Sequence, residues 1–124
     1  MFGKSVKNGD TIVVKIWWRS YSNMATYRMK NGRLKLIMDM PAERRHPIIY
    51  NLMGATPRLF GAICSQMIDR ARDEHAAIGI YRVDRDIGNL KLIRLYGGKL
   101  LPQVVSDLAT QDGVAMGPIR ELVL

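Results

Sequence analysis

The chain has 124 residues, of which 48% are hydrophobic and 24% are charged. This length suits one domain, and the composition is ordinary for a globular protein, so disorder over most of the chain is not expected. One cysteine, Cys64, excludes an intramolecular disulfide, and no stretch approaches the roughly 20 apolar residues that span a bilayer. We therefore expect one basic domain over residues 1–124, located in the cytoplasm and away from membranes.

Positive charge is concentrated at the start of the chain. The whole sequence has 19 basic and 11 acidic side chains, a net charge of +8. Residues 1–35 hold eight basic and one acidic side chain, a balance of +7, which leaves +1 for the rest. A charge excess focused on one region favours a polyanionic partner. Lysine-rich strands also occur simply because they keep a sheet soluble.

The first 40 residues predict a three-stranded antiparallel meander. Residues 11–21, 25–30 and 33–40 are rich in β-branched and aromatic residues, which is typical of strands. Ser22-Asn23 is the expected first turn. Asn31-Gly32 is a strong hairpin signal, because a type I′ turn requires positive φ at both central residues. Pro41 ends the third strand.

These two turns predict a register, in which Trp18 faces Tyr27 and Tyr27 faces Leu36. Because side chains alternate between the faces of a sheet, the register separates apolar from basic residues. The predicted apolar face carries Ile12, Val14, Ile16, Trp18, Tyr27, Met29, Leu34, Leu36 and Met38. The predicted basic face carries Lys15, Trp17, Arg19, Arg28, Lys30, Arg33 and Lys35.

Helices and a second hairpin follow the meander. A short helix is expected over 47–52, ended by Gly54, and a longer one begins with Thr56 as N-cap and Pro57 at the first helical position. Helical spacing predicts one apolar stripe on the longer helix, formed by Leu59, Phe60, Ile63, Cys64, Met67, Ile68 and Ala71. Residues 77–83 and 90–96 predict two strands, 102–110 a short helix, and 114–124 an apolar tail that forms a last strand or docks on a partner chain.

This order of elements predicts an α+β fold. We expect an antiparallel sheet, made of the N-terminal meander and the second hairpin, packed against one long helix and one or two short helices. The apolar C-terminal tail suggests a homodimer.

The basic face is the principal functional candidate. Single-stranded nucleic acid is typically bound by a positive groove with aromatic side chains on which bases stack. Trp17 or Tyr21 is the expected stacking platform. The phosphate-binding residues expected around it are Lys15, Arg19, Arg28, Lys30, Arg33 and Lys35, extended by Arg44 and Arg45. Two other interpretations stay open: basic stems cover Trp17, with a cation–π contact to Arg28, or helices pack on both faces of the sheet and bury Trp17.

Other chemistry is less well supported. Residues 47–52 and 57–73 have the spacing of a helix-turn-helix, but few base-reading side chains occupy its second helix. His46 and His75 lie 29 residues apart and form no metal-ligand pair with Cys64 at a usual spacing. Asp84 and Asp86 have the spacing of a magnesium site, although aspartates in loops are more often turn residues. We expect no catalytic residue, metal, cofactor or small-molecule substrate.

The sequence therefore predicts a non-catalytic accessory or regulatory protein that binds DNA or RNA through a basic β face. The alternative is a protein-interaction module, an inhibitor or adaptor, whose basic face meets an acidic partner.

Overall fold

The structure, a computed structural model, describes residues 6–19, 21–39, 45–84, 89–110, 114–115 and 122–123. Five antiparallel strands form its sheet in the order β3-β2-β1-β4-β5. Their bounds are β1 Thr11–Trp18, β2 Tyr21–Lys30, β3 Arg33–Asp39, β4 Ala77–Asp84 and β5 Asn89–Tyr96. Two short strands, β6 (Val114–Ala115) and β7 (Leu122–Val123), pair in parallel with β5.

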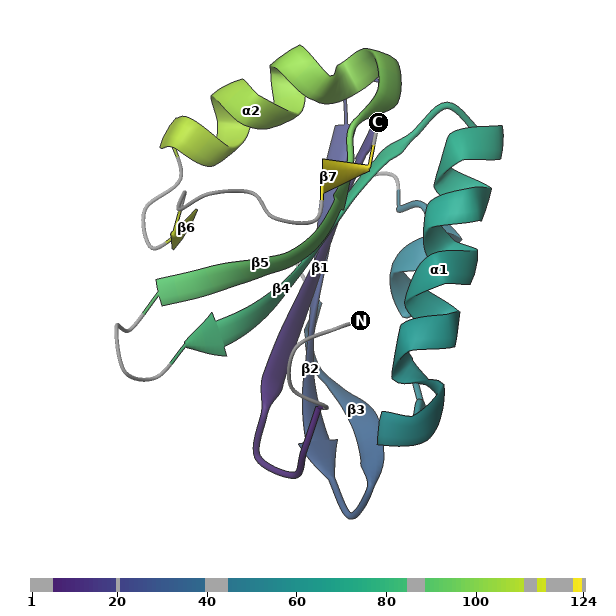
Figure 1. Cartoon of the computed structure of the whole chain (residues 1–124), viewed down its shortest axis with the longest axis vertical. Coiled ribbons are helices and arrows are strands. Elements are labelled where there is room, and N and C mark those ends of the chain that lie inside the picture. The colour runs from purple at the N-terminus through teal and green to yellow at the C-terminus, as the bar shows by residue number, and fades with distance from the viewer. Residues whose placement is uncertain are drawn as a thin grey trace.

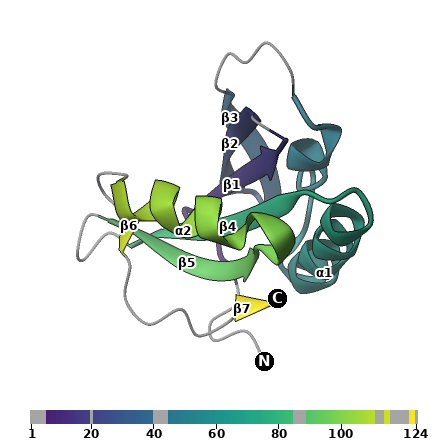
Figure 2. The same ribbon diagram turned by 90° about the horizontal axis from the view of Figure 1, so that it is seen from above.

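The helices complete an α+β architecture, as predicted. They are α1 (Pro57–Asp73), α2 (Leu101–Thr110) and two 3-10 turns, η1 (Pro47–Tyr50) and η2 (Gly98–Leu100). Figures 1 and 2 show α1 and α2 on opposite sides of the twisted sheet. In the described part of the chain, neither helix is both long enough and apolar enough to cross a bilayer.

The β2–β3 hairpin forms as its turn predicts. Asn31 and Gly32 have φ values of +52° and +76°, and Lys30 pairs with Arg33. Asn and Gly tolerate this left-handed region better than other residues, so the turn type follows directly from the sequence. The Asn8 side chain also accepts a 2.9 Å hydrogen bond from the Gly32 amide, which ties the turn to the segment before β1.

The predicted turn at Ser22-Asn23 is wrong. The chain reverses between Trp18 and Tyr21, which pair directly, and Ser22 and Asn23 lie inside β2. Tyr27 therefore pairs with Ile12 rather than with Trp18, a shift of six residues along β1. Because this shift is even and side chains alternate with a period of two, residues 12–18 of β1 and 27–30 of β2 keep their predicted faces.

Met38 does not keep its predicted face. A bulge in the β2–β3 pairing places Leu36 opposite Tyr27 but Met38 opposite Thr26, so Ile37 is an extra residue in β3. One extra residue reverses the alternation, and Met38 leaves the apolar face and is 59% exposed.

Helix α1 begins as predicted and covers the apolar face. The Thr56 side chain accepts a hydrogen bond from the Leu59 amide, and Pro57 occupies the first turn. Phe60, Cys64 and Met67 join the same buried cluster as Ile16 and Tyr27 of the sheet. Leu59 is 52% exposed and does not belong to the buried stripe.

The helix-turn-helix interpretation is wrong. The segment before α1 is a four-residue 3-10 helix, η1, rather than the longer helix over 47–52 that this interpretation requires. After it, the Gly54 amide donates to the Leu34 carbonyl and the Leu34 amide donates to the Ala55 carbonyl. These residues therefore extend the outer edge of β3 and do not form the turn of a DNA-reading motif.

A second core lies on the opposite face of the sheet. Its buried members are Val13, Trp17, Ala77, Tyr81, Leu95 and Val104. Val104 comes from α2, and Leu100 and Leu101 pack against the same cluster. The sheet is thus covered on both sides along part of its width, with α2 above β4 and β5 (Figure 2).

Candidate nucleic-acid interface

Four of the predicted site residues form a compact group on the β2–β3 hairpin. Arg28 pairs with Lys35 and Lys30 pairs with Arg33, all four side chains are exposed, and alternation directs them away from α1. We call Arg28, Lys30, Arg33 and Lys35 the basic quartet. Cross-strand neighbours lie about 5 Å apart and next-but-one residues along a strand about 7 Å apart, so the quartet occupies a small rectangle.

The quartet concentrates four positive charges on one short hairpin. None of the ion pairs among the described residues involves any of its members. The Arg33 guanidinium donates to the Gly54 carbonyl at 3.2 Å, which holds this side chain at the β3 edge. Like charges placed directly across a sheet destabilise it, so two consecutive pairs of cations weaken the isolated hairpin. An anion bound across them removes that repulsion.

Lys15 and Trp17 lie on the same face but are not accessible. Trp17 is 0% exposed because it belongs to the second core together with Val104 of α2. Lys15, whose ammonium lies over the Trp17 ring, is 8% exposed. Trp17 therefore cannot act as an open stacking platform in this structure, and the prediction that it is exposed is wrong. The burial of Trp17 by a helix on the second face was one of the alternatives that the sequence left open.

Contacts around Trp17 fix the position of α2. The indole Nε1 donates a 2.7 Å hydrogen bond to the Asp107 carboxylate on α2. The Lys15 ammonium lies 5.2 Å from the centre of the Trp17 ring, so the cation–π partner is Lys15 and not Arg28. Burial lowers the pKa of Lys15, and the nearby Asp107 carboxylate opposes that change.

Arg19 and Tyr21 do not belong to the basic face. Arg19 has a φ of +56° at the chain reversal, and its guanidinium lies 4.8 Å from the centre of the Trp18 ring. Tyr21 pairs with Trp18, whose side chain packs against the core beneath α1. The prediction that Arg19 and Tyr21 contribute to the basic face is wrong, because the predicted strand runs on through the actual point of reversal.

Arg45 lies apart from the quartet as well. It is exposed and donates a 3.1 Å hydrogen bond to the hydroxyl of Tyr50 in η1. Arg44 and Asp86 lie outside the described residues, so the predicted extension of the basic face and the magnesium-site alternative are not placed. Within the described chain, no group of three or more potential ligands is arranged to hold a metal ion.

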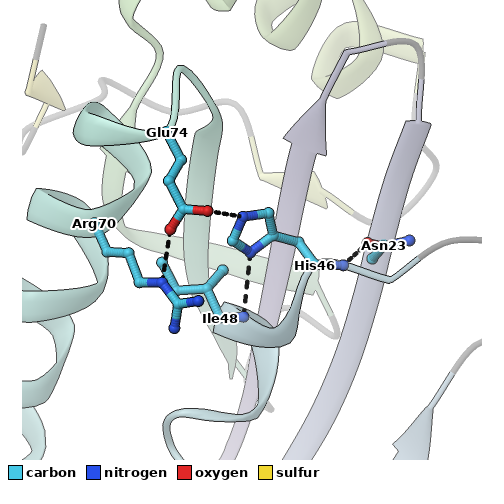
Figure 3. Close-up of polar contacts among 5 residues, drawn as sticks. All are labelled: Asn23, His46, Ile48, Arg70 and Glu74. Carbon is cyan, nitrogen blue, oxygen red and sulfur yellow. Dashed lines mark hydrogen bonds and ion pairs between the residues drawn. The ribbon is translucent and has the colours of Figure 1, made fainter.

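A buried histidine network joins three elements and is the most developed polar cluster in the described chain (Figure 3). His46 Nδ1 accepts a 3.2 Å bond from the Ile48 amide, so Nε2 carries the ring proton and faces the Glu74 carboxylate at 3.0 Å. The Asn23 side chain accepts from the His46 amide at 2.7 Å, and Arg70 donates to Glu74 at 2.7 Å.

This network is structural in character. Both ring nitrogens of His46 are engaged, so neither is free to bind a metal or to move a proton to a substrate. The hydrogen bonds join β2, η1 and the end of α1, and thereby fix the connection that follows the meander. The sequence did not predict it, because its three elements are brought together only by the tertiary fold.

The sequence does contain a signal for the second core. Residues 12–18 are apolar at every position except Lys15, a near-continuous run that indicates a strand buried on both faces. A strand with one solvated face shows strict alternation instead.

Comparison of the chain with protein-family models, with curated proteins and with solved structures gives no match. The candidate interface is therefore supported only by the positions and charges of its residues.

Proposed function

We propose that this protein is a non-catalytic accessory or regulatory protein that binds the phosphate backbone of DNA or RNA through the basic quartet. The observation that carries the proposal is the pairing of Arg28 with Lys35 and of Lys30 with Arg33 on an exposed face. Phosphates supply the negative charge that this arrangement lacks, and the release of their counterions supplies much of the binding free energy.

The quartet supports backbone contact rather than the reading of bases. No aromatic side chain lies among its four members in the paired strands, so the quartet itself offers no platform for stacking. Exposed lysine and arginine position a protein on nucleic acid without reading its sequence. We therefore expect weak sequence preference and binding to duplexes as well as to single strands.

The test is a fluorescence-anisotropy titration of labelled mixed-sequence oligonucleotides, single- and double-stranded. The double variant Arg28→Gln with Lys35→Gln removes one cross-strand pair and should weaken binding at least about tenfold at moderate salt. The control, Arg72→Gln with Lys99→Gln, removes the same charge from α1 and η2 and should have a much smaller effect. Equal losses in both variants would mean that only net charge matters, and would contradict a defined interface.

An acidic protein partner is the second candidate. Met38 is 59% exposed and, through its pairing with Thr26, lies on the same face as the quartet. Exposed methionine beside arginine is characteristic of protein interfaces. In the same titration, this alternative predicts weak oligonucleotide binding without saturation at a defined site size.

A further inference from the structure

Three buried side chains on the face of the basic quartet form a surface that α2 covers. They are Lys15 and Trp17 of β1 and Tyr81 of β4, and their exposed fractions are 8%, 0% and 2%. We call these three residues the covered shelf. Thr11, Lys15 and Trp17 are alternate residues of β1 and share one face. Thr11 pairs with Arg28 of the quartet, and Lys15 pairs with Met24 of the same strand β2. The covered shelf is therefore continuous with the face that carries the quartet.

Polar groups in the covered shelf are incompletely satisfied. The Tyr81 hydroxyl is buried and has no hydrogen-bond partner among the described residues. A Cβ placed on Gly79 would lie 2.6 Å from this hydroxyl, so the Tyr81 side chain lies over Gly79, the cross-strand partner of Lys15. Lys15 takes part in none of the ion pairs of the described chain, and its ammonium has the Trp17 ring as a neighbour.

Closing α2 over these groups removes them from water and compensates them only in part: Asp107 accepts from Trp17 and lies near Lys15, but the Tyr81 hydroxyl gains no partner among the described residues. A buried hydroxyl without a partner opposes burial, and so does a buried ammonium without an ion pair. The bond from Trp17 to Asp107 and the contacts of Leu101 and Val104 are among the interactions that hold α2 in place. The helix is joined to β5 through Gly97 and the 3-10 turn η2 (Gly98–Leu100), in which Gly98 has a φ of +53°.

We propose that α2 is a displaceable cover, and that lifting it exposes the covered shelf to single-stranded nucleic acid. A base then stacks on Trp17, the Lys15 ammonium meets a phosphate, and the strand continues onto the quartet. This inference rests on the proposed function, since it assigns to the same face a second mode of binding. In the closed state Asp107 occupies the shelf as an intramolecular anion, accepting from Trp17 and lying near Lys15.

The covered shelf should bind single strands rather than duplexes because of its aromatic ring. Every base has a face that stacks on an aromatic ring, but a paired base in a duplex is not available to do so. The quartet alone contacts the backbone of either form. Opening α2 should therefore strengthen the binding of single strands and leave the binding of duplexes nearly unchanged.

The experiment compares Asp107→Ala with Asp107→Asn in a Trp18→Phe background, in which Trp17 is the only tryptophan. Both substitutions remove the charge, but only asparagine keeps an acceptor for the indole. If α2 is closed in most molecules, only the open fraction can bind a single strand through the shelf. Loss of the bond to Trp17 in Asp107→Ala should then raise the affinity for a single strand about fivefold over that of Asp107→Asn. The duplex affinity should stay the same in both variants. Acrylamide should quench Trp17 more strongly in Asp107→Ala than in Asp107→Asn.

Equal single-strand affinities in the two variants, with Trp17 equally protected from acrylamide, would overturn the cover. If that result came with duplex binding that still depends on Arg28 and Lys35, the proposed function would stand without the cover. Absence of any oligonucleotide binding would remove both. Val104→Ala serves as a second route, because it loosens α2 without altering the charge or the hydrogen bond, and it should shift single-strand binding in the same direction.

Discussion

Two buried tyrosines should respond in opposite ways to the same substitution. The Tyr81 hydroxyl is buried without a hydrogen-bond partner in the described chain, whereas the Tyr27 hydroxyl donates to the Ile49 carbonyl. Burying an unpaired hydroxyl costs about 1–3 kcal/mol, and an ordinary hydrogen bond contributes about 1 kcal/mol. Tyr81→Phe should therefore raise the free energy of unfolding by about 1 kcal/mol or more. Tyr27→Phe should lower it by about 1–3 kcal/mol, since it also leaves the Ile49 carbonyl without this bond.

Urea denaturation followed by tryptophan fluorescence measures both changes, and each variant controls for the other because the volume removed is the same. For a domain of this length, about 1 kcal/mol corresponds to a shift of roughly 4 °C in the melting temperature. Destabilisation of both variants by similar amounts would refute the reasoning. It would mean that the Tyr81 hydroxyl has a partner and that its burial does not oppose the closure of α2 over the shelf.

Three further outcomes follow from single side chains. The hydrogen bond from Arg70, aided by His46, lowers the pKa of Glu74. The stability that this carboxylate contributes is therefore fully present above about pH 4.5 and is lost as the pH falls through the lowered pKa. Glu74→Gln should flatten the acid side of a plot of urea midpoint against pH; an unchanged slope would contradict the network. Burial raises the pKa of Cys64 to about 12, so a thiol reagent should label the native protein only as fast as it unfolds, and labelling at the rate of a free thiol would contradict its burial. Gly79→Ala places a methyl group 2.6 Å from the Tyr81 hydroxyl and should lower the free energy of unfolding by about 1–3 kcal/mol, whereas an unchanged urea midpoint would contradict that contact.

Local chemistry explains which parts of the fold could be predicted. The hairpin turn needs two residues that tolerate positive φ, and Asn31-Gly32 supplies them. The start of α1 needs a side-chain acceptor followed by a residue without an amide donor, and Thr56-Pro57 supplies both. Each feature is therefore determined by two neighbouring residues. The reversal before Tyr21 involves Arg19 in the left-handed region, which arginine seldom adopts. Its sequence carries no turn signal of the usual kind, whereas Ser22-Asn23 is a more typical turn sequence and therefore predicts the wrong reversal point.

The candidate site was predicted in part for the same reason. The Asn31-Gly32 turn and the alternation of side chains, both of which are local, determine where Arg28, Lys30, Arg33 and Lys35 lie. The structure pairs these four residues across the hairpin, as predicted. Trp17 depended on whether a helix some 90 positions later packs on the second face. The apolar run over residues 12–18 indicates that this strand is buried on both faces, but nothing within the meander shows which later element covers the second face.

Salt dependence tests the central claim most directly, because it counts the phosphates that the quartet neutralises. The logarithm of the binding constant for a mixed-sequence duplex should fall linearly with the logarithm of the salt concentration. If each of Arg28, Lys30, Arg33 and Lys35 neutralises one phosphate, the slope should be about 3.6 units steeper in the parent protein than in a variant with all four changed to glutamine. Equal slopes in the two proteins would contradict binding at the basic quartet.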